Sequence, residues 1–198
     1  MKEINIAKSG IVLFLVSIIT VFVIAGVNYF ARPQIIAAAA AARVAALGQV
    51  LPDVVDSSFS QEVITGQNNG VIAHFVGFAY GEPVGVVVEI NIPGFNPDLN
   101  MVVGIGLDGA VVGMEVIGHR ETPGFGDFLT EEWFSALFRG MTYGIEVTRS
   151  QPGSNQIQVV SRATVSTEAA VSGMNMALAH VRDVVLPNIS QYVPEGGN

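Results

Sequence analysis

Residues 101–118 read MVVGIGLDGAVVGMEVIG, two runs rich in β-branched residues that are separated by Asp108 and Gly109. An Asp-Gly pair in this setting is a strong local signal for a β-hairpin, because both residues tolerate the positive φ angles of a two-residue turn. Two further runs of the same kind precede this hairpin, at 71–80 and 84–91. The sequence therefore predicts an antiparallel-leaning sheet of at least four strands.

Shorter elements are predicted after the hairpin. Residues 130–140, TEEWFSALFRG, predict a helix that Thr130 caps and Gly140 ends. Two β-type runs, 144–149 and 157–161, follow and are separated by a polar turn.

The last long helix is predicted over residues 167–186. Its apolar side chains recur every three or four positions, which is the spacing of one helix face. These positions are Val171, Met174, Leu178, Val181 and Val185. Together the patterns predict an α+β fold, with a mainly antiparallel sheet and flanking helices.

A long apolar segment lies near the N-terminus. Residues 10–30, GIVLFLVSIITVFVIAGVNYF, contain no charged residue. At about 1.5 Å of rise per residue, a helix of this length crosses the roughly 30 Å hydrocarbon layer of a bilayer. The segment is longer than the apolar part of a cleaved signal peptide, about 7–15 residues, and soluble core helices are rarely apolar on every side. We predict a single transmembrane helix over residues 10–31, with a cleaved signal and a buried soluble helix as alternatives.

The segment after the span predicts another helix. Residues 34–52 are rich in alanine, the best helix former, and the pattern ends near Gly48 and Pro52. We expect residues 32–52 to form a helical stalk that continues the anchor.

Positive charges around the span predict its orientation. Lys2, Lys8 and the amino terminus precede the span, whereas Arg32 and Arg43 follow it. The small excess on the N-terminal side favours a cytoplasmic N-terminus, residues 1–9, and an exported C-terminal part.

The composition argues against several kinds of partner and site. The chain has a net charge of −8 and both of its lysines precede the span, so the part after the span is more acidic still, which argues against nucleic acid as a partner. The absence of cysteine excludes disulfides, cysteine-ligated zinc and iron–sulfur clusters. His74, His119 and His180 show no ligand spacing, so we interpret them as ordinary core or surface residues and predict no metal site.

Residues 161–167, SRATVST, lie between the last predicted strand and the last helix, with Thr164 in the turn. A helix N-terminus offers unpaired backbone N–H groups and a partial positive charge, and Arg162 adds a full charge beside it. The segment is therefore a candidate anion site next to a threonine hydroxyl. Turns of this composition are also ordinary helix caps, and both interpretations remain open at this point.

Residues 118–128, GHRETPGFGDF, form a second polar loop, whose backbone is constrained by three glycines and a proline. Its polar residues include Arg120, Glu121, Thr122 and Asp127. Loops of fixed shape can present donors to a planar ligand, although an ordinary connection is the alternative.

These segments together resemble a known family. ETPGFGD at 121–127, EEWFSALFRG at 131–140 and SRATVSTEAAV at 161–171 resemble the FMN-binding domain of the G subunit of the Rnf ion-translocating electron-transport complex. The C subunit of the sodium-translocating NADH:quinone reductase is related and is an alternative, but the short chain with an immediate anchor looks more like the Rnf subunit. The resemblance implies an FMN-binding domain over residues 53–198.

The resemblance also implies that FMN is covalently attached. In this family a flavin transferase takes FMN from FAD and joins its phosphate to a threonine that corresponds to Thr164. A threonine hydroxyl is a weak nucleophile without an adjacent base, which fits activation by an outside enzyme. The motif residues expected to flank the attachment point are Arg162, Ala163, Val165, Ser166 and Thr167, of which Ser166 and Thr167 are the fallback attachment points. The residues expected to border the isoalloxazine ring are Glu121, Thr122 and the backbone from Pro123 to Gly126, including Gly124.

Two residues depart from the family motif. Arg162 stands where the family most often has glycine, and Gln158 stands where an acidic residue commonly precedes the motif. Either departure can weaken recognition by the transferase, whereas Arg162 can also compensate by pairing with the phosphodiester. Noncovalent FMN binding is therefore an alternative.

The function implied by the resemblance is electron transfer. The chain would be a membrane-anchored flavoprotein subunit of an Rnf-type ferredoxin:NAD⁺ oxidoreductase that moves Na⁺ or H⁺, without stand-alone catalysis. Its expected partners are the other subunits of the complex, the flavin transferase and the bacterial inner membrane, with the flavin domain on the periplasmic side. A redox regulator with the same domain and a flavin-free exported docking domain are the alternatives.

Overall fold

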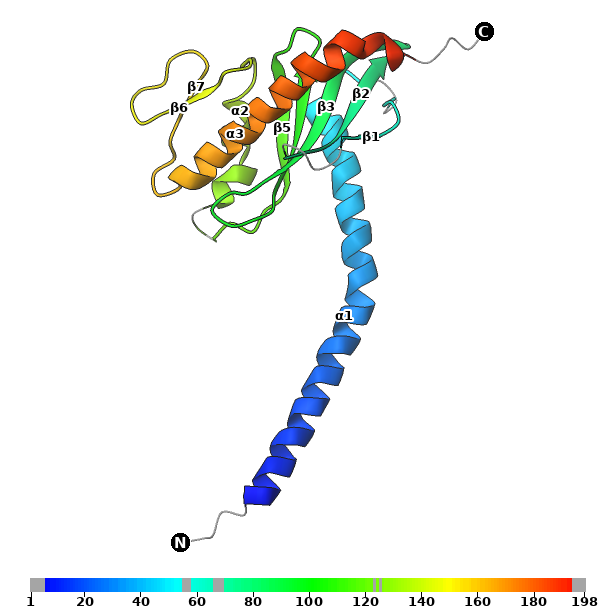
Figure 1. Ribbon diagram of the computed structural model, residues 1–198, viewed down its shortest axis with the longest axis vertical. Helices are drawn as coiled ribbons and strands as arrows, with labels where there is room; N and C mark the ends of the chain where they lie inside the picture. Colours follow the sequence, from blue (N-terminus) through cyan, green and yellow to red (C-terminus); the bar gives the residue numbers. More distant parts are fainter. Residues whose placement is uncertain (1–5, 55–57, 66–69, 123, 125, 194–198) are drawn as a thin grey trace. The chain divides into compact units, whose positions relative to one another are not determined.

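The computed structural model describes residues 6–54, 58–65, 70–122, 124 and 126–193. The chain divides into two compact units, Met1–Ala42 and Arg43–Asn198. Helix α1, Ile6–Val50, begins in the first unit and ends in the second (Figure 1). Its most apolar window has a mean hydropathy of 2.9 and is 0% buried, so α1 is a candidate membrane span. This agrees with the predicted single N-terminal span.

The predicted anchor and stalk form one continuous helix. Pro33 lies inside α1, and the helix runs past Gly48 to Val50. Gly48 therefore does not end the helix, which stops two residues before Pro52.

The second unit is built on a five-stranded antiparallel sheet with the order β1-β2-β3-β4-β5. Its strands are β1 (Val63–Ile64), β2 (Val71–Ala79), β3 (Glu82–Ile92), β4 (Leu99–Gly106) and β5 (Val111–Gly118). The four predicted strands are confirmed, and Gly109, with a φ of +79°, forms the turn between β4 and β5. The two-residue β1 was not predicted, because so short a strand carries no periodic pattern.

One face of the sheet is covered by α3, Thr164–His180, which runs across it in Figure 1. A π-helical turn, Val181–Val185, and a 3₁₀ segment, Leu186–Gln191, continue from α3. The five apolar positions predicted for this helix are all buried in the core. Its amphipathic pattern therefore gave the packed face correctly.

The other face of the sheet receives the last two turns of α1, within the second unit. Ala46, Leu47, Val50 and Leu51 are buried there. Three glycines, Gly85, Gly104 and Gly113, make room for them, and we call these three residues the glycine seat. A Cβ on Gly113 would lie 3.0 Å from the Cα of Val50, one on Gly85 would lie 2.8 Å from Leu51, and one on Gly104 would overlap the Val50 carbonyl.

Arg43 lies one turn before the buried C-terminal residues of α1. It forms ion pairs with Glu62 and with Glu89, and its guanidinium lies 5.5 Å from the centre of the Phe75 ring. Glu89 is only 8% exposed, and Arg43 is its ion-pair partner.

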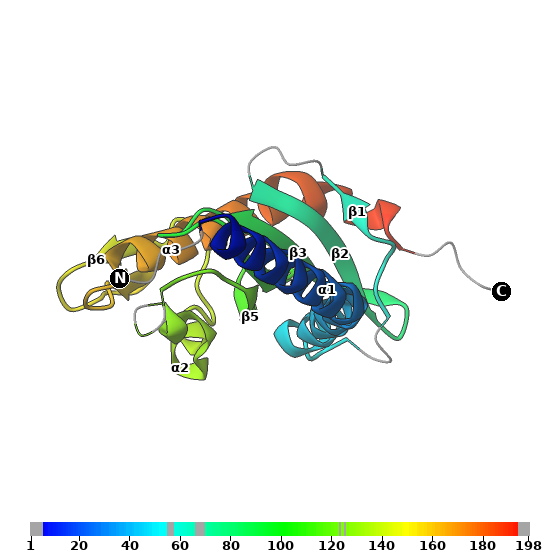
Figure 2. The same cartoon turned by 90° about the horizontal axis from the view of Figure 1, so that it is seen from below.

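The predicted helix over 130–140 is much shorter than expected. A 3₁₀ turn, η2 (Asp127–Thr130), precedes α2, Glu132–Ala136, which lies at the β5 side of the sheet in Figure 2. The prediction that Thr130 caps the helix is wrong. Its hydroxyl donates to the Asp127 carbonyl at 2.8 Å, because Thr130 ends the 3₁₀ turn and the extended Glu131 separates the two segments.

The two short runs after α2 form a pair of strands. They are β6, Glu146–Thr148, and β7, Gln156–Gln158, which pair in parallel. Both strands are shorter than the sequence predicted.

Candidate functional site

A cavity of about 480 Å³ brings together three segments that lie far apart in the sequence. This volume falls within the roughly 300–1,000 Å³ that is usual for small-molecule sites. The residues that line it are Phe95, Glu121, Thr122, Arg162, Ala163, Thr164, Val165 and Ser166. Both motifs singled out in the sequence therefore meet at one cavity.

Thr164 is the first residue of α3, so the helix begins earlier than the sequence predicted. The N-cap residue Ala163 provides no side-chain hydrogen bond to the helix end. Among the described residues, no group accepts from the backbone N–H groups of Thr164, Val165 and Ser166, and the Thr164 hydroxyl makes no hydrogen bond. Free N–H groups at the positive end of a long helix favour an anion beside this hydroxyl.

Arg162 adopts a left-handed backbone conformation, with a φ of +67°. This conformation is readily available to glycine and costs other residues roughly 1–2 kcal/mol. Arg162, which departs from the motif described above, is therefore less favourable at this position than a glycine would be. The Arg162 side chain is exposed and forms no ion pair with the part of the chain that the structure describes.

Glu121 holds the three segments together. Its Oε2 accepts a hydrogen bond from the Ser166 hydroxyl at 2.6 Å, and its Oε1 accepts one from the Asn96 N–H at 3.2 Å. The residue is only 7% exposed. Because both carboxylate oxygens are used, Glu121 fixes the distance between the loop that bears it, the turn at Asn96 and the first turn of α3.

Two glycines shape the loop that carries Glu121. Gly126 leaves no room for a Cβ, which would overlap the Glu121 side chain, and its N–H donates to the Thr122 carbonyl at 3.1 Å. Gly124 has a φ of +81° and donates its N–H to Asp127 at 2.7 Å.

Some predicted site residues do not line the cavity. Gly124 and Gly126 support the loop, while Pro123 and Phe125 lie outside the described residues. Thr167 is fully buried, and its hydroxyl donates to the Ala163 carbonyl at 2.9 Å and accepts from the Val160 N–H at 3.3 Å. Its position is therefore that of a packed structural residue.

Phe95 is a lining residue that the sequence interpretation missed. It lies in the connection between β3 and β4, and 66% of its surface is exposed. The one available signal was an aromatic residue within a run of glycine, proline and asparagine, IPGFNP at 92–97.

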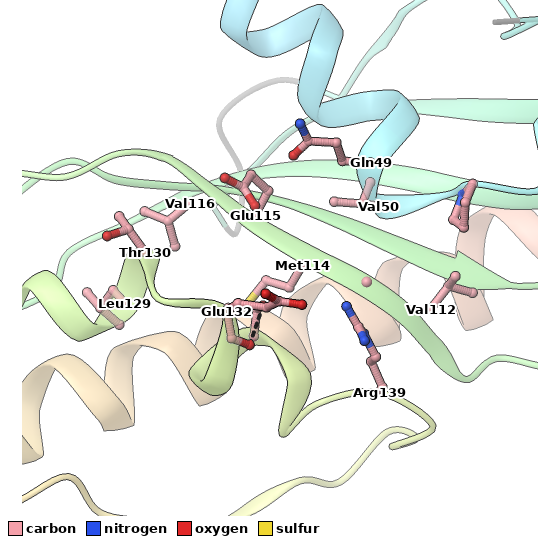
Figure 3. A pocket seen from close by; sticks show the side chains of 13 residues that line it. Gln49, Val50, Val112, Met114, Glu115, Val116, Leu129, Thr130, Glu132 and Arg139 are labelled. Carbon is pink, nitrogen blue, oxygen red and sulfur yellow. Dashed lines mark hydrogen bonds between the residues drawn. The ribbon is translucent and has the colours of Figure 1, made fainter.

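A second cavity, of about 540 Å³, lies between the end of α1, β5 and α2. Figure 3 shows Gln49 and Val50 on one side of it and Glu132 and Arg139 on the other. Glu115 also lines it, and burial raises the pKa of that carboxyl group. None of the residues in the two sequence motifs lines this second cavity.

Two of the three histidines meet in the fold. His180 Nε2 lies 3.1 Å from His74 Nδ1, and His74 Nε2 lies 3.0 Å from the Tyr192 hydroxyl. Burial, followed by the neighbouring His180, lowers the pKa of His74 to about 4, and burial also lowers the pKa of His180. The sequence spacing gave no sign of this proximity.

Comparisons with known proteins match both the anchor and this cavity to family models. Residues 1–50 match the RnfG N-terminal region, and residues 94–179 match the FMN-binding domain. The chain is similar to RnfG proteins over both regions. Every residue that lines the 480 Å³ cavity lies within the FMN-binding match, and α1 coincides with the RnfG N-terminal match.

Relatives that are named as G subunits match most of the chain. The chain is 26% identical to the G subunit of the Na⁺-translocating ferredoxin:NAD⁺ oxidoreductase complex of Acetobacterium woodii, over 86% of this chain and 89% of the relative. It is 25% identical to the G subunit of the ion-translocating oxidoreductase complex of Vibrio atlanticus, over 97% and 98%. Among solved structures, NqrC of Shewanella oneidensis is similar with a TM-score of 0.48 and 20% identity, over 65% of this chain and 67% of that chain.

The cavity suits the parts of FMN. The free N–H groups of α3 and the Arg162 cation suit the phosphate, and the Thr164 hydroxyl lies on the same wall. Phe95 and Val165 supply apolar surface for a flat ring. The donor set and the apolar walls therefore fit the cofactor of the family.

Proposed function

We propose that this chain is a membrane-anchored flavoprotein subunit that relays electrons within an Rnf-type ferredoxin:NAD⁺ oxidoreductase coupled to Na⁺ or H⁺ movement. Its FMN is joined through a phosphodiester to Thr164 by a flavin transferase. The RnfG N-terminal and FMN-binding matches support the assignment, as do relatives that are named as G subunits of such complexes. When bound, FMN supplies the redox chemistry, and the protein supplies attachment, orientation and tuning.

The observation that carries the attachment proposal is the state of the Thr164 hydroxyl. Thr164 lines the cavity and is the first residue of α3, and its hydroxyl makes no hydrogen bond within the described part of the chain. By contrast, the hydroxyls of Ser166 and Thr167 are engaged with Glu121 and with the Ala163 carbonyl. Ser161, the remaining hydroxyl residue of the motif, does not line the cavity, so Thr164 is the cavity-lining hydroxyl residue of the motif that can be modified without breaking a contact among the described residues.

The phosphodiester would be held by α3 and Arg162. The N–H groups of Val165 and Ser166 point from the start of the helix, where the helix dipole favours negative charge. Arg162 also lines the cavity, and its guanidinium would donate a charge-assisted hydrogen bond to the phosphodiester. This bond would offset the cost of an arginine where the motif usually has glycine.

The ring would lie between Phe95 and the loop of Glu121 and Thr122, with Gly124 and Gly126 shaping that loop. Glu121 keeps the walls at a fixed separation through its bonds to Asn96 and Ser166. A covalent link would retain the cofactor outside the cytoplasm, because tethering fixes its effective concentration independently of affinity.

The domain arrangement follows from this function. Residues 10–31 of α1 would cross the inner membrane, 32–52 would form the stalk, and 53–198 would hold the flavin on the periplasmic side. The slight excess of positive charge before the span, from Lys2, Lys8 and the amino terminus against Arg32 and Arg43 after it, supports this orientation.

Replacement of Thr164 tests the attachment. The full chain is produced together with the flavin transferase, and we expect the wild-type protein to show a fluorescent flavin band on a denaturing gel and a mass gain of one FMN minus water. Thr164→Ala removes the acceptor hydroxyl, so both signals should be absent. Thr122→Ala is the matched control, since Thr122 lines the same cavity and should keep both signals.

Two results would contradict the proposal. A flavin band in Thr164→Ala would move the attachment to another residue, and an unmodified wild-type chain in the presence of an active transferase would favour noncovalent binding or a flavin-free docking domain. Copurification with the other subunits of a sodium-translocating NADH:quinone reductase, rather than with Rnf subunits, would favour the alternative that this chain is the C-type subunit of that enzyme.

A further inference from the structure

Phe95 is an exposed aromatic residue that the fold itself does not use. Two thirds of its surface is exposed, at 66%, and it is absent from both core clusters. It makes no ring contact with any residue that the structure describes. Its exposed ring borders a cavity, so it is available to an apolar part of a ligand bound there.

The backbone around Phe95 is fixed rather than loose. The Gly94 N–H donates to the Asn96 carbonyl at 3.0 Å, and the Asn96 N–H donates to Glu121 at 3.2 Å. A Cβ on Gly94 would overlap the Glu121 carboxylate, so a larger residue there would have to displace that side chain. Glu121 in turn accepts from Ser166, so the turn that carries Phe95 is tied to the start of α3.

This connection places Phe95 and Thr164 on walls of the same cavity. Val165, the next residue of α3, is also a large apolar side chain with 48% of its surface exposed, and it lines the same cavity. An exposed aromatic ring and an exposed aliphatic side chain thus border a space next to the free hydroxyl. A flat aromatic ligand would cover both of them.

We propose that Phe95 is the aromatic wall of the cofactor site and packs against one face of the isoalloxazine ring of a flavin attached at Thr164. The inference rests on the proposed function and adds a positioning residue that lies outside both motifs. Aromatic rings in contact stabilise each other beyond the burial of their surface. Phe95 therefore restricts the orientation of a ring that is otherwise tethered through its flexible ribityl phosphate.

Two consequences follow for the bound ring. Phe95 shields one face from water, which leaves the opposite face and the ring edge for an electron-transfer partner. It also lowers the polarity around that face, because a phenyl ring replaces water there. A purely structural Phe would have neither effect on the flavin.

Flavin fluorescence tests the contact directly. An excited flavin accepts an electron from a tryptophan in van der Waals contact and loses its emission, whereas a distant tryptophan has little effect. The full chain carrying Phe95→Trp is produced with the flavin transferase and compared with the wild type at equal flavin content. We expect Phe95→Trp to lose most of its flavin emission.

Tyr80 provides the matched control. It is also aromatic, is 92% exposed and follows β2 at a distant turn, so Tyr80→Trp should keep the wild-type emission. A second readout uses iodide, which quenches exposed flavins. Phe95→Ala should increase quenching by iodide, because one face of the ring becomes open to solvent, whereas Tyr80→Ala should not.

The outcomes separate this inference from the proposed function. If all variants carry covalent flavin but Phe95→Trp emits as strongly as the wild type and Phe95→Ala leaves iodide quenching unchanged, the role of Phe95 is refuted while the proposed function stands. If the wild-type chain carries no covalent flavin, the proposed function fails and the inference fails with it. Loss of folding is not expected to obscure either result, because Phe95 lies outside the core.

Discussion

At Arg162 the backbone conformation favours glycine, whereas the proposed phosphate site favours a cation. Its left-handed backbone is a conformation that glycine adopts more easily, yet its guanidinium is a cation in a chain with a net charge of −8. The sequence revealed that Arg162 departs from the motif. It did not reveal the left-handed backbone at this position, because the turn between β7 and α3 sets that φ angle. The same limit applied to Phe95, whose role depends on a turn held by Glu121.

Replacing Arg162 by glycine should stabilise the flavin-free protein. The change removes the left-handed strain but adds backbone freedom to the unfolded chain, so we expect a net gain of about 0.5–1 kcal/mol in the free energy of unfolding. The melting temperature of protein made without the flavin transferase measures this. Arg149→Gly is the control: Arg149 is exposed and is not among the residues with positive φ, so its replacement should give no gain. A lower melting temperature for Arg162→Gly would show that the side chain makes stabilising contacts.

Secondary elements were predictable where a pattern repeats. The four long strands and the buried face of α3 follow from alternation and from helical spacing. The shortness of α2 and the parallel pairing of β6 with β7 were not predictable. So few residues show no periodic pattern, and tertiary contacts decide their conformation. Of the two interpretations of SRATVST, the side-chain helix cap is not observed at Ala163, the N-cap of α3, and the anion site stays a prediction.

The junction of α3 with the sheet should make stability depend on pH. The pKa of His74 is lowered to about 4 in the folded state, so the unfolded chain binds more protons as the pH falls below about 6.5. Stability should be complete above that pH and decrease towards pH 4, by up to roughly 3 kcal/mol. His180, whose pKa is also lowered by burial, acts in the same direction.

Melting temperatures between pH 7.5 and pH 4.5 measure this effect. His74→Gln cannot titrate and should flatten the dependence, whereas His119→Gln should retain it. The comparison cancels groups that both proteins share, such as Glu115, whose raised pKa acts in the opposite direction. An equally steep decline in His74→Gln would assign the acid sensitivity to other residues.

At the scale of the whole molecule, the proposed topology puts the flavin unit on the far side of the membrane from the N-terminus. The chain has no cysteine, so a single introduced thiol reports its own position. We expect Ser172→Cys, on an exposed position of α3, to react with a membrane-impermeant maleimide in spheroplasts. Ser9→Cys, before the apolar segment, should react only after the cells are opened. The reverse pattern would place the flavin unit in the cytoplasm.

The glycine seat has a practical consequence for anyone who wishes to excise the flavin unit from its anchor. A fragment that starts at Asp53 would lack Ala46, Leu47, Val50 and Leu51, and it would expose the apolar trough that these side chains fill. Such a fragment should aggregate even though every cofactor residue is present. A fragment that starts just before Arg43 would keep these four buried side chains and the ion pairs to Glu62 and Glu89. It is therefore the better starting point for a water-soluble version.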